Sequence, residues 1–292
     1  MLTRRTAVAG LAGTLAVSAL PLRAATPLSA REVFAQIKRA SGQKWDPNPT
    51  DDRIIFGDRA VPVTGIATCF FASVDVLRRA KAAGLNYVIP HEASFFERYD
   101  DFAESALLDS DPVLVAKKGY LTANAMVIQR MHGHAHSRPG DAIMIGLLRQ
   151  LGWEQYRKAN KPGMPWLELP AASAQEVGRH IKQALGRRTL RMFGDPERII
   201  STVSLSAGMP GENAQIQQLE SSADAVFLGE VREPEVLGYA QDMAASRKIN
   251  VFLTGHTNED AGMGVVADWL GTVFPNLPVK WLPLVDPYTN PA

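Results

Sequence analysis

Short apolar strands alternate with amphipathic helices along most of this 292-residue chain. The segment ASVDVLRRAKAAG has the spacing of an amphipathic helix that ends at Gly84, and NYVIP directly after it is typical of a short buried strand. The strands AVFLGE and NVFLTG are each followed by a helical pattern, the second by GMGVVADWLGTVF. This alternation with short links predicts an α/β fold in which helices cover the sheets.

A Pro- and Gly-rich segment, KANKPGMPW, has the composition of a linker near the middle of the chain. We therefore expect an N-terminal α/β lobe over residues 26–160 and a C-terminal α/β lobe over 161–292. Within the first lobe we expect TANAMVIQRM to form a strand that leads directly into the histidine-rich turn.

A loose internal repeat indicates that the two lobes are related by pseudo-symmetry. The segments LRRAKAAGLNYVIPHE and IQQLESSADAVFLGE both run helix, turn, strand and acidic residue. A second pair, around VIQRMHGHAH and VFLTGHTNED, runs strand, His-containing turn and helix. Chance similarity is the alternative, because the repeat is weak. The paired residues are Glu92 with Glu230, His132 with His256, and His136 with Asp260.

The first 25 residues, MLTRRTAVAGLAGTLAVSALPLRAA, have the pattern of an export signal. A basic start precedes an apolar run that is short for a membrane span, and small residues follow where a peptidase could cut. Arg4 and Arg5 resemble a twin-arginine signal, and an ordinary export signal is the alternative. We expect a periplasmic mature protein with no membrane span after cleavage.

Charge and cysteine content exclude several classes of protein. Removing residues 1–24 removes Arg4, Arg5 and Arg23 and no acidic residue, so the net charge falls from +1 to −2. Such a chain has no basic field for nucleic acid. Cys69 is the single cysteine, which excludes an internal disulfide and a thiolate-type metal site.

Potential metal ligands gather at three turns that follow predicted strands. Carboxyl ends of strands in α/β sheets are where ligands bind, and imidazole with carboxylate suits Zn, Mn, Fe or Co. The candidates exceed what one ion needs, so we expect two divalent ions that activate a hydrolytic water between them. They are His91 and Glu92; His132, His134 and His136; and His256, Glu259 and Asp260.

Each turn also has a structural explanation without metal. His91 and Glu92 could belong to an ordinary loop, and HGHAH could be a solvent-facing turn. HTNED could serve as a helix cap, since Asn258 and Asp260 are good capping residues. Three such turns in equivalent places favour the metal site.

The segments VTGIATCFFASVDVLRRAKAAGLNYVIPHE, LGE and LTGHTNEDAGM resemble the Nif-three-like dinuclear-metal-centre hexameric proteins, also called GTP cyclohydrolase I type 2 homologues. The resemblance extends from about Gly57 to Pro287. It implies a Nif-three-like fold and two metal ions that face the cavity of a toroidal homohexamer.

The resemblance also implies a ligand set, with departures from the family pattern. The family's His-His pair falls on His91 and Glu92, and its His-x3-Asp turn falls on His132 and His136. Its His-x3-Glu turn falls on His256 and Asp260, with Glu259 as the alternative, and His134 has no counterpart.

From these residues we expect a metal-dependent hydrolase of a small-molecule substrate, in which Glu92 or Glu230 carries the proton. A non-catalytic protein that stores or delivers an ion is the first alternative, because it would use the same ligands. GTP ring opening, implied by the family name, is the second, and an assembly scaffold is the third.

Overall fold

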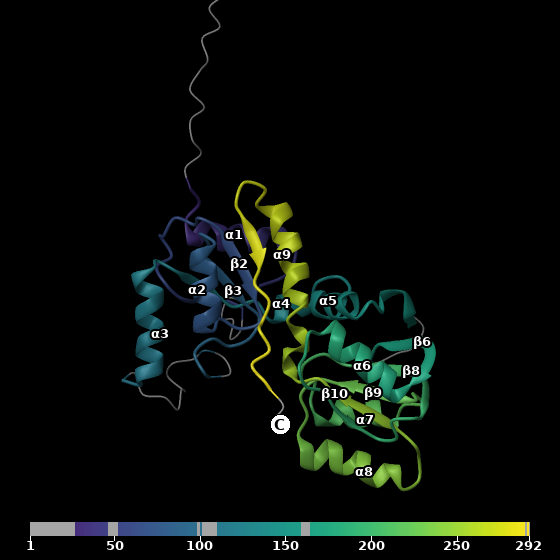
Figure 1. Ribbon diagram of the computed structural model, residues 1–292. Helices are drawn as coiled ribbons and strands as arrows, with labels where there is room; N and C mark the ends of the chain where they lie inside the picture. Colours follow the sequence, from purple (N-terminus) through teal and green to yellow (C-terminus); the bar gives the residue numbers. More distant parts are fainter. Residues whose placement is uncertain are drawn as a thin grey trace, which may run out of the picture.

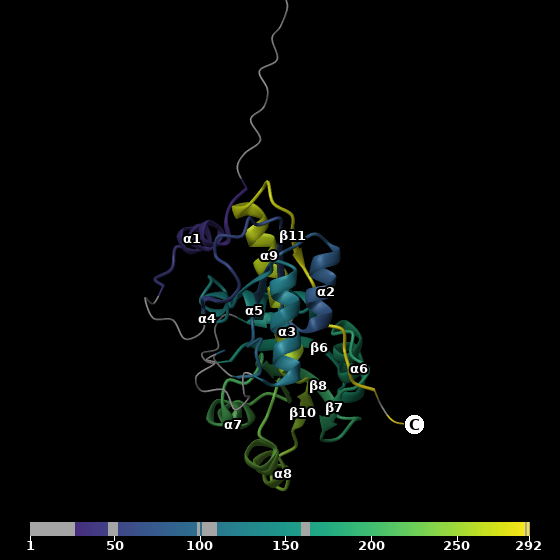
Figure 2. The ribbon, with the colours of Figure 1, turned by 90° about the vertical axis from the view of Figure 1, so that its left-hand side faces the viewer.

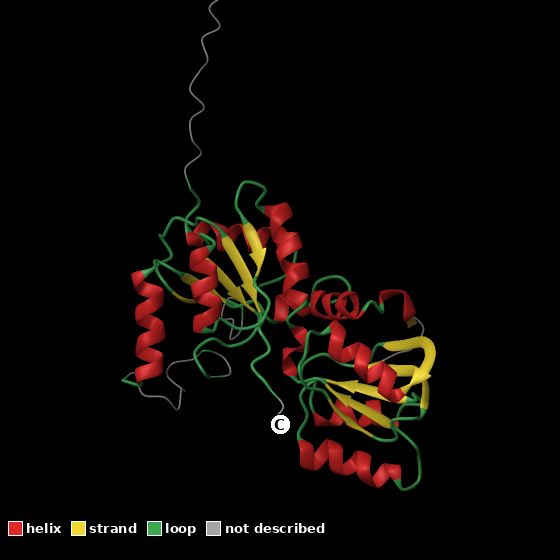
Figure 3. Ribbon diagram, viewed as in Figure 1, coloured by secondary structure: helices red, strands yellow, loops and turns green. Residues whose placement is uncertain are grey.

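The computed structural model describes residues 27–45, 52–97, 100, 110–158, 164–289 and 291. The expected export signal lies outside the described residues. Two sheets, each covered by helices, form two lobes (Figures 1 and 3). The predicted α/β fold is confirmed, and no described helix has both the length and the apolar character that a membrane crossing needs.

The first sheet has the strand order β1-β4-β3-β2-β11. β11, β2, β3 and β4 run parallel, and β1 pairs antiparallel with β4 at the edge. The strands are β1 (Ile54–Phe56), β2 (Ile66–Cys69), β3 (Tyr87–Pro90), β4 (Val127–Gln129) and β11 (Val279–Trp281).

The second sheet, β5-β6-β8-β9-β10-β7, repeats this central arrangement. β8, β9 and β10 run parallel as β2, β3 and β4 do, and β7 pairs antiparallel with β10 as β1 does with β4. The internal repeat therefore corresponds to equivalent strands. These strands are β5 (Arg157–Lys158), β6 (Trp166–Ser173), β7 (Arg191–Phe193), β8 (Ile199–Leu205), β9 (Ala225–Leu228) and β10 (Asn250–Leu253).

The helices connect these strands, and several begin with a capping side chain. Ser29 and Glu32 form a capping box at the start of α1. The helices are α1 (Ala30–Ser41), α2 (Val74–Ala82), α3 (Pro112–Ala123), α4 (Gly133–His136), α5 (Ala142–Leu151), α6 (Ala174–Ala184), α7 (Glu212–Glu220), α8 (Gly238–Ala244) and α9 (Gly262–Val273), with the short turns η1 (Glu154–Tyr156), η2 (Glu233–Leu237) and η3 (His256–Glu259).

Alternate residues of the central strands pack on opposite faces of each sheet. Tyr87 and Ile89 of β3 pack in the core that includes α1 and α9, whereas Val88 packs in the core that includes α2 and α3. Figure 2 shows α1 and α2 on opposite sides of the first lobe. In β9, Phe227 packs toward α6 and Leu228 toward α7 and α8. Helices on both faces explain why these strands are apolar throughout.

The C-terminal segment returns to the first sheet. β11 pairs in parallel with β2, so the part of the chain expected to form one lobe over 161–292 also supplies an edge of the first sheet. α9 packs closely on α5, where a Cβ at Gly146 would overlap the carbonyl group of Ala261. Because α5 contributes Ile143 to the first core and Leu147 to the second, this helix pair fixes the two lobes against each other.

Candidate metal centre

Three turns that follow parallel strands converge between the two lobes. His91 and Glu92 follow β3, α4 with its histidines follows β4, and η3 follows β10 of the second sheet. Close contacts between imidazole nitrogens and carboxylate oxygens join side chains from all three turns. We call the resulting group the ligand cluster; it comprises His91, Glu92, His132, His136, His256 and Glu259.

The imidazole rings of the first lobe lie against one another. The His91 ring stacks on the His132 ring with 4.5 Å between centroids, and the His136 ring lies edge-on, 5.1 Å from each. The predicted approach of His91, His132 and His136 is therefore present in the fold.

Two carboxylates lie between the rings of the two lobes. Oε1 of Glu92 lies 3.5 Å from Nε2 of His132 and 3.3 Å from Nε2 of His256. Oε2 of Glu259 lies 3.2 Å from Nε2 of His91 and 3.3 Å from Nε2 of His256, while Oε1 lies 3.9 Å from Nε2 of His136. Each carboxylate thus faces histidines from both lobes.

Outer contacts fix the orientation of three of the rings. Nδ1 of His91 lies 3.3 Å from the carbonyl oxygen of Met131, and Nδ1 of His136 lies 3.2 Å from Oδ2 of Asp141. Nδ1 of His256 lies 2.8 Å from Oε2 of Glu230. Metal-binding histidines commonly have such an acceptor on one ring nitrogen, which leaves the other nitrogen for the ion.

Burial and neighbouring charges shift the pKa values of the potential ligands. Burial lowers the pKa of His91, which keeps its ring neutral. Burial would raise the pKa of Glu259, but His256 and His91 lower it to about 2. Burial would likewise lower the pKa of His256, but Glu259, Glu92 and Glu230 raise it to about 11. The carboxylates therefore stabilise positive charge at this point, and a divalent cation would displace the proton of His256.

The residues present fit a metal ion. Nε2 of His91 and Oε2 of Glu259 are buried, and neither has a hydrogen-bond partner of suitable geometry among the described residues. Unsatisfied buried donors and acceptors are costly in a folded protein, and a cation would satisfy both atoms. Two groups of potential ligands have their atoms within 4.8 Å of one another: His91, His132 and His136, and His91, Glu92 and Glu259.

Two predicted ligands do not reach the ligand cluster. The carboxylate of Asp260 accepts hydrogen bonds from the Leu284 N–H (3.0 Å) and from Nε1 of Trp281 (3.5 Å), so it faces the C-terminal segment. In the turn η3 it is Glu259 that faces the histidines. His134 contacts the buried carboxylate of Asp52 instead.

Three residues around the ligand cluster were not predicted. Asp52 accepts the backbone N–H groups of His132 and His134, Asp141 contacts the His136 ring, and Nη2 of Arg130 lies 3.1 Å from Oε2 of Glu92. Asp141 could have been found as the N-cap of α5. No sequence pattern links Asp52 or Arg130 to the histidines.

The Gly-rich segment SAGMPGEN packs against the ligand cluster. Gly208 has φ +52°, and its N–H donates to Oδ1 of Asn258 (2.9 Å). A Cβ at this position would overlap the Glu259 carboxylate. Glycine is thus required here by the close approach of a candidate ligand.

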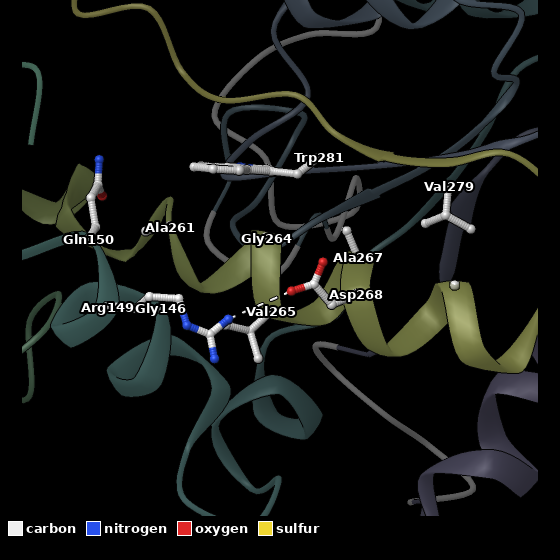
Figure 4. Close-up of a pocket in the computed structure, with 11 residues that line it drawn as sticks. Gly146, Arg149, Gln150, Ala261, Gly264, Val265, Ala267, Asp268, Val279 and Trp281 are labelled. Carbon is white, nitrogen blue, oxygen red and sulfur yellow. Dashed lines mark ion pairs between the residues drawn. The ribbon is translucent and has the colours of Figure 1, made fainter. Parts of the chain in front are cut away.

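A cleft of about 810 Å³ opens beside the ligand cluster and is lined by five of its members and by Glu230. A second cavity of about 590 Å³ lies between α5, α9 and β11, where the Trp281 ring lies over Gly264 and Arg149 pairs with Asp268 at 3.6 Å (Figure 4). No residue of the ligand cluster lines that second cavity. The chemistry of the metal centre therefore belongs to the larger cleft.

Fold and cluster together define a two-lobed α/β protein with a candidate metal centre between its lobes. The chain belongs to the Duf34/NIF3 (NGG1p interacting factor 3) family, whose model matches residues 30–287. The comparison with curated proteins found no match.

Solved structures of low sequence identity share the fold. The Staphylococcus aureus hypothetical protein SA1388 is 16% identical, with a TM-score of 0.69 over 90% of this chain and 99% of that one. The protein ybgI, of unknown function, is 22% identical, with a TM-score of 0.67 over 89% and 100%. A Bacillus cereus protein related to NIF3 is 14% identical, with a TM-score of 0.68 over 91% and 100%.

Proposed function

We propose that this protein is a metal-dependent hydrolase of a small-molecule substrate, with two divalent ions held by the ligand cluster. The observation that carries the proposal is the convergence of Nε2 atoms and carboxylates on one space beside an open cleft. Six potential ligands exceed the three or four protein ligands that one zinc-type ion takes.

The positions of the carboxylates support two ions over one. His91 belongs to both groups of potential ligands, although a ring nitrogen has a single lone pair and can serve one ion. Glu259 presents Oε1 toward His136 and Oε2 toward His91 and His256, so its two oxygens can reach two ions. We assign Glu259 as the bridging ligand.

Bound divalent ions would supply an activated water and would polarise the electrophile. Glu230 would carry the proton, because it lines the cleft, is half-exposed and contacts Nδ1 of His256 at 2.8 Å. Glu92 is less suited to that role, since hydrogen bonds with His132 and His256 outweigh its burial and hold its pKa well below the ordinary range. We therefore assign Glu92 as a ligand and Glu230 as the proton carrier.

Storage or delivery of an ion would use the same ligands. The cleft beside the ligand cluster favours hydrolysis, because catalysis needs a coordination position that a substrate can reach and storage does not. Metal analysis of the purified protein, followed by hydrolysis assays on ester, amide and phosphoester libraries, tests the proposal. We expect about two ions per chain and activity that is lost in His91→Ala and His256→Ala; metal without hydrolysis would favour storage.

We further propose that the protein is exported to the periplasm and assembles as a homohexamer. The first proposal is supported by the twin arginines at positions 4 and 5, the second by the family resemblance. Cell fractionation of the wild type and an Arg4→Lys/Arg5→Lys variant tests export, and light scattering of the mature protein tests the hexamer. Retention of the wild type in the cytoplasm, or a monomer in solution, would contradict them.

A further inference from the structure

We infer that the cleft beside the ligand cluster contains an apolar subsite formed by Met144, Met164 and Met209, which binds the aromatic or aliphatic body of a substrate without a polyphosphate group. This inference rests on the proposed function, because the reacting group of that substrate would lie at the bound ions. All three methionines line the cleft that five members of the ligand cluster also line.

Met144 and Met209 are each tied to a candidate ligand through a neighbouring residue. The N–H of Met144 donates to Oδ1 of Asp141 (3.2 Å), and the other oxygen of that carboxylate contacts the His136 ring. Met209 follows Gly208, which packs directly against Glu259. Met144 is therefore held on the side of the cleft near His136, and Met209 on the side near Glu259.

Met164 comes from a third segment. It precedes Pro165, whose carbonyl oxygen accepts the N–H of Leu205 at the end of β8 (2.9 Å). Ser206 follows Leu205 and lines the same cleft. Three separate segments thus place methionines around one space, and Ala207 and Pro210 extend its apolar surface.

Methionine suits a substrate body better than a rigid aliphatic side chain. Its unbranched chain adapts to irregular shapes, and its sulfur makes favourable contacts with aromatic rings. Met164 and Met209 are half-buried, so both retain surface that a ligand can cover.

The charges in the cleft oppose a polyphosphate. Outside the ligand cluster, the cationic side chains among the described lining residues are Arg130 and Arg232. Arg130 lies 3.1 Å from Glu92, and Arg232 lies 3.5 Å from Glu212. Outside the ligand cluster, the carboxylates of Asp141, Glu212 and Glu230 line the same space, so a polyphosphate that extended beyond the bound ions would meet more carboxylates than arginines, and both arginines are already paired. The inferred substrate is neutral or carries a single negative charge.

Two hydroxamates test the subsite, because both chelate a metal ion but only one carries a ring. The zinc-loaded protein is titrated calorimetrically with acetohydroxamate and with benzohydroxamate. We expect benzohydroxamate to bind about tenfold more tightly, as an aromatic contact with methionines would give. The gain should fall to about twofold in Met164→Ala/Met209→Ala, while acetohydroxamate affinity stays constant. Met243→Ala, which changes a half-buried methionine of α8 outside the cleft, is the matched control.

Methionine methyl NMR gives an independent readout without turnover. With methyl-labelled methionine, benzohydroxamate should shift the resonances of Met164 and Met209 and leave that of Met243 unchanged. Metal-dependent binding of both hydroxamates with no gain from the ring, or a gain that persists in the double variant, would overturn the subsite and leave the proposed function standing. Failure of both hydroxamates to bind would overturn both. Tighter binding of β,γ-imido GTP than of benzohydroxamate would overturn the inferred substrate class.

Discussion

Nε2 of His91 and Oε2 of Glu259 face each other at 3.2 Å between the two lobes, and both side chains are buried. Neither atom has a hydrogen-bond partner of suitable geometry among the described residues. A buried pair of this kind is unfavourable on its own, because desolvation of each group is not repaid. A cation held by both atoms would remove this unfavourable arrangement.

Glu259→Gln should reduce metal affinity at least about a hundredfold, because it removes the charge of the proposed bridging ligand. Asp260→Asn is the matched control, since its carboxylate faces Leu284 and Trp281 and lies outside the ligand cluster. Isothermal titration with Zn²⁺ and metal analysis measure both variants. Normal metal content in Glu259→Gln, with loss in Asp260→Asn, would reverse our ligand assignment.

Asp52→Asn should weaken metal binding about tenfold and destabilise the fold by about 1–3 kcal/mol. The Asp52 carboxylate accepts the N–H groups of His132 and His134, and an amide would turn a donor toward one of them. Asp75→Asn changes an exposed aspartate on α2 and should leave metal affinity unchanged. Equal affinities for zinc in the Asp52 variant and the wild type would show that the turn holds its shape without this carboxylate.

Gly208→Ala should lose metal because its Cβ would displace the Glu259 carboxylate. Gly211→Ala separates this crowding from backbone strain. Gly211 also has a positive φ, +100°, but a Cβ there meets no atom within 4 Å. We expect both variants to be destabilised and only Gly208→Ala to lose zinc, as measured by thermal unfolding and metal analysis. Equal loss of zinc in Gly208→Ala and Gly211→Ala would show that backbone strain, and not displacement of the Glu259 carboxylate, causes the loss.

Asp224 should contribute stability that is lost in acid. Burial would raise the pKa of Asp224, but hydrogen bonds from Ser201 and Thr202 lower it. A carboxyl group whose pKa is lower in the folded state stabilises the fold above its unfolded pKa, and this contribution disappears as pH falls through the folded value. Asp224→Asn should therefore destabilise the protein at pH 7 by about 1–3 kcal/mol, and the difference from wild type should shrink below about pH 4.

Urea unfolding at pH 7 and at pH 3 measures the difference in the free energy of unfolding between wild type and Asp224→Asn. Asp242→Asn, at an exposed position of α8, is the control for the substitution itself. A gap between wild type and Asp224→Asn that stays constant from pH 7 to pH 3 would contradict the role of this carboxylate.

The sequence predicted the parts of the fold that repeat. Alternating periodicity identified the central strands and placed His91, His132 and His256 after them, because the carboxyl ends of parallel strands share one edge. It did not predict that β11 joins the first sheet, since that pairing joins segments far apart in the chain. TANAMVIQRM forms a strand only over Val127–Gln129, because its first residues continue α3 and Ala125 has φ +48°.

The sequence pattern could not decide which of several neighbouring residues are ligands. Glu259 and Asp260 are neighbours, and only the conformation of the turn η3 decides which one faces the histidines. His134 has the same residue type and spacing as its neighbours, but the Asp52 carboxylate and the stacked ring of Trp45, 3.6 Å away, hold it outside the ligand cluster. The first choice depends on the local turn conformation, and the second depends on segments that no sequence spacing connects to His134.

Crystals of the metal-loaded protein, with anomalous diffraction measured on both sides of the absorption edge of the bound metal, test the central claim most directly. The account predicts two anomalous peaks about 3.5–4 Å apart, with Glu259 between them and His91, His132 and His136 around the first. A fully loaded crystal whose anomalous peaks all lie away from these residues would contradict it.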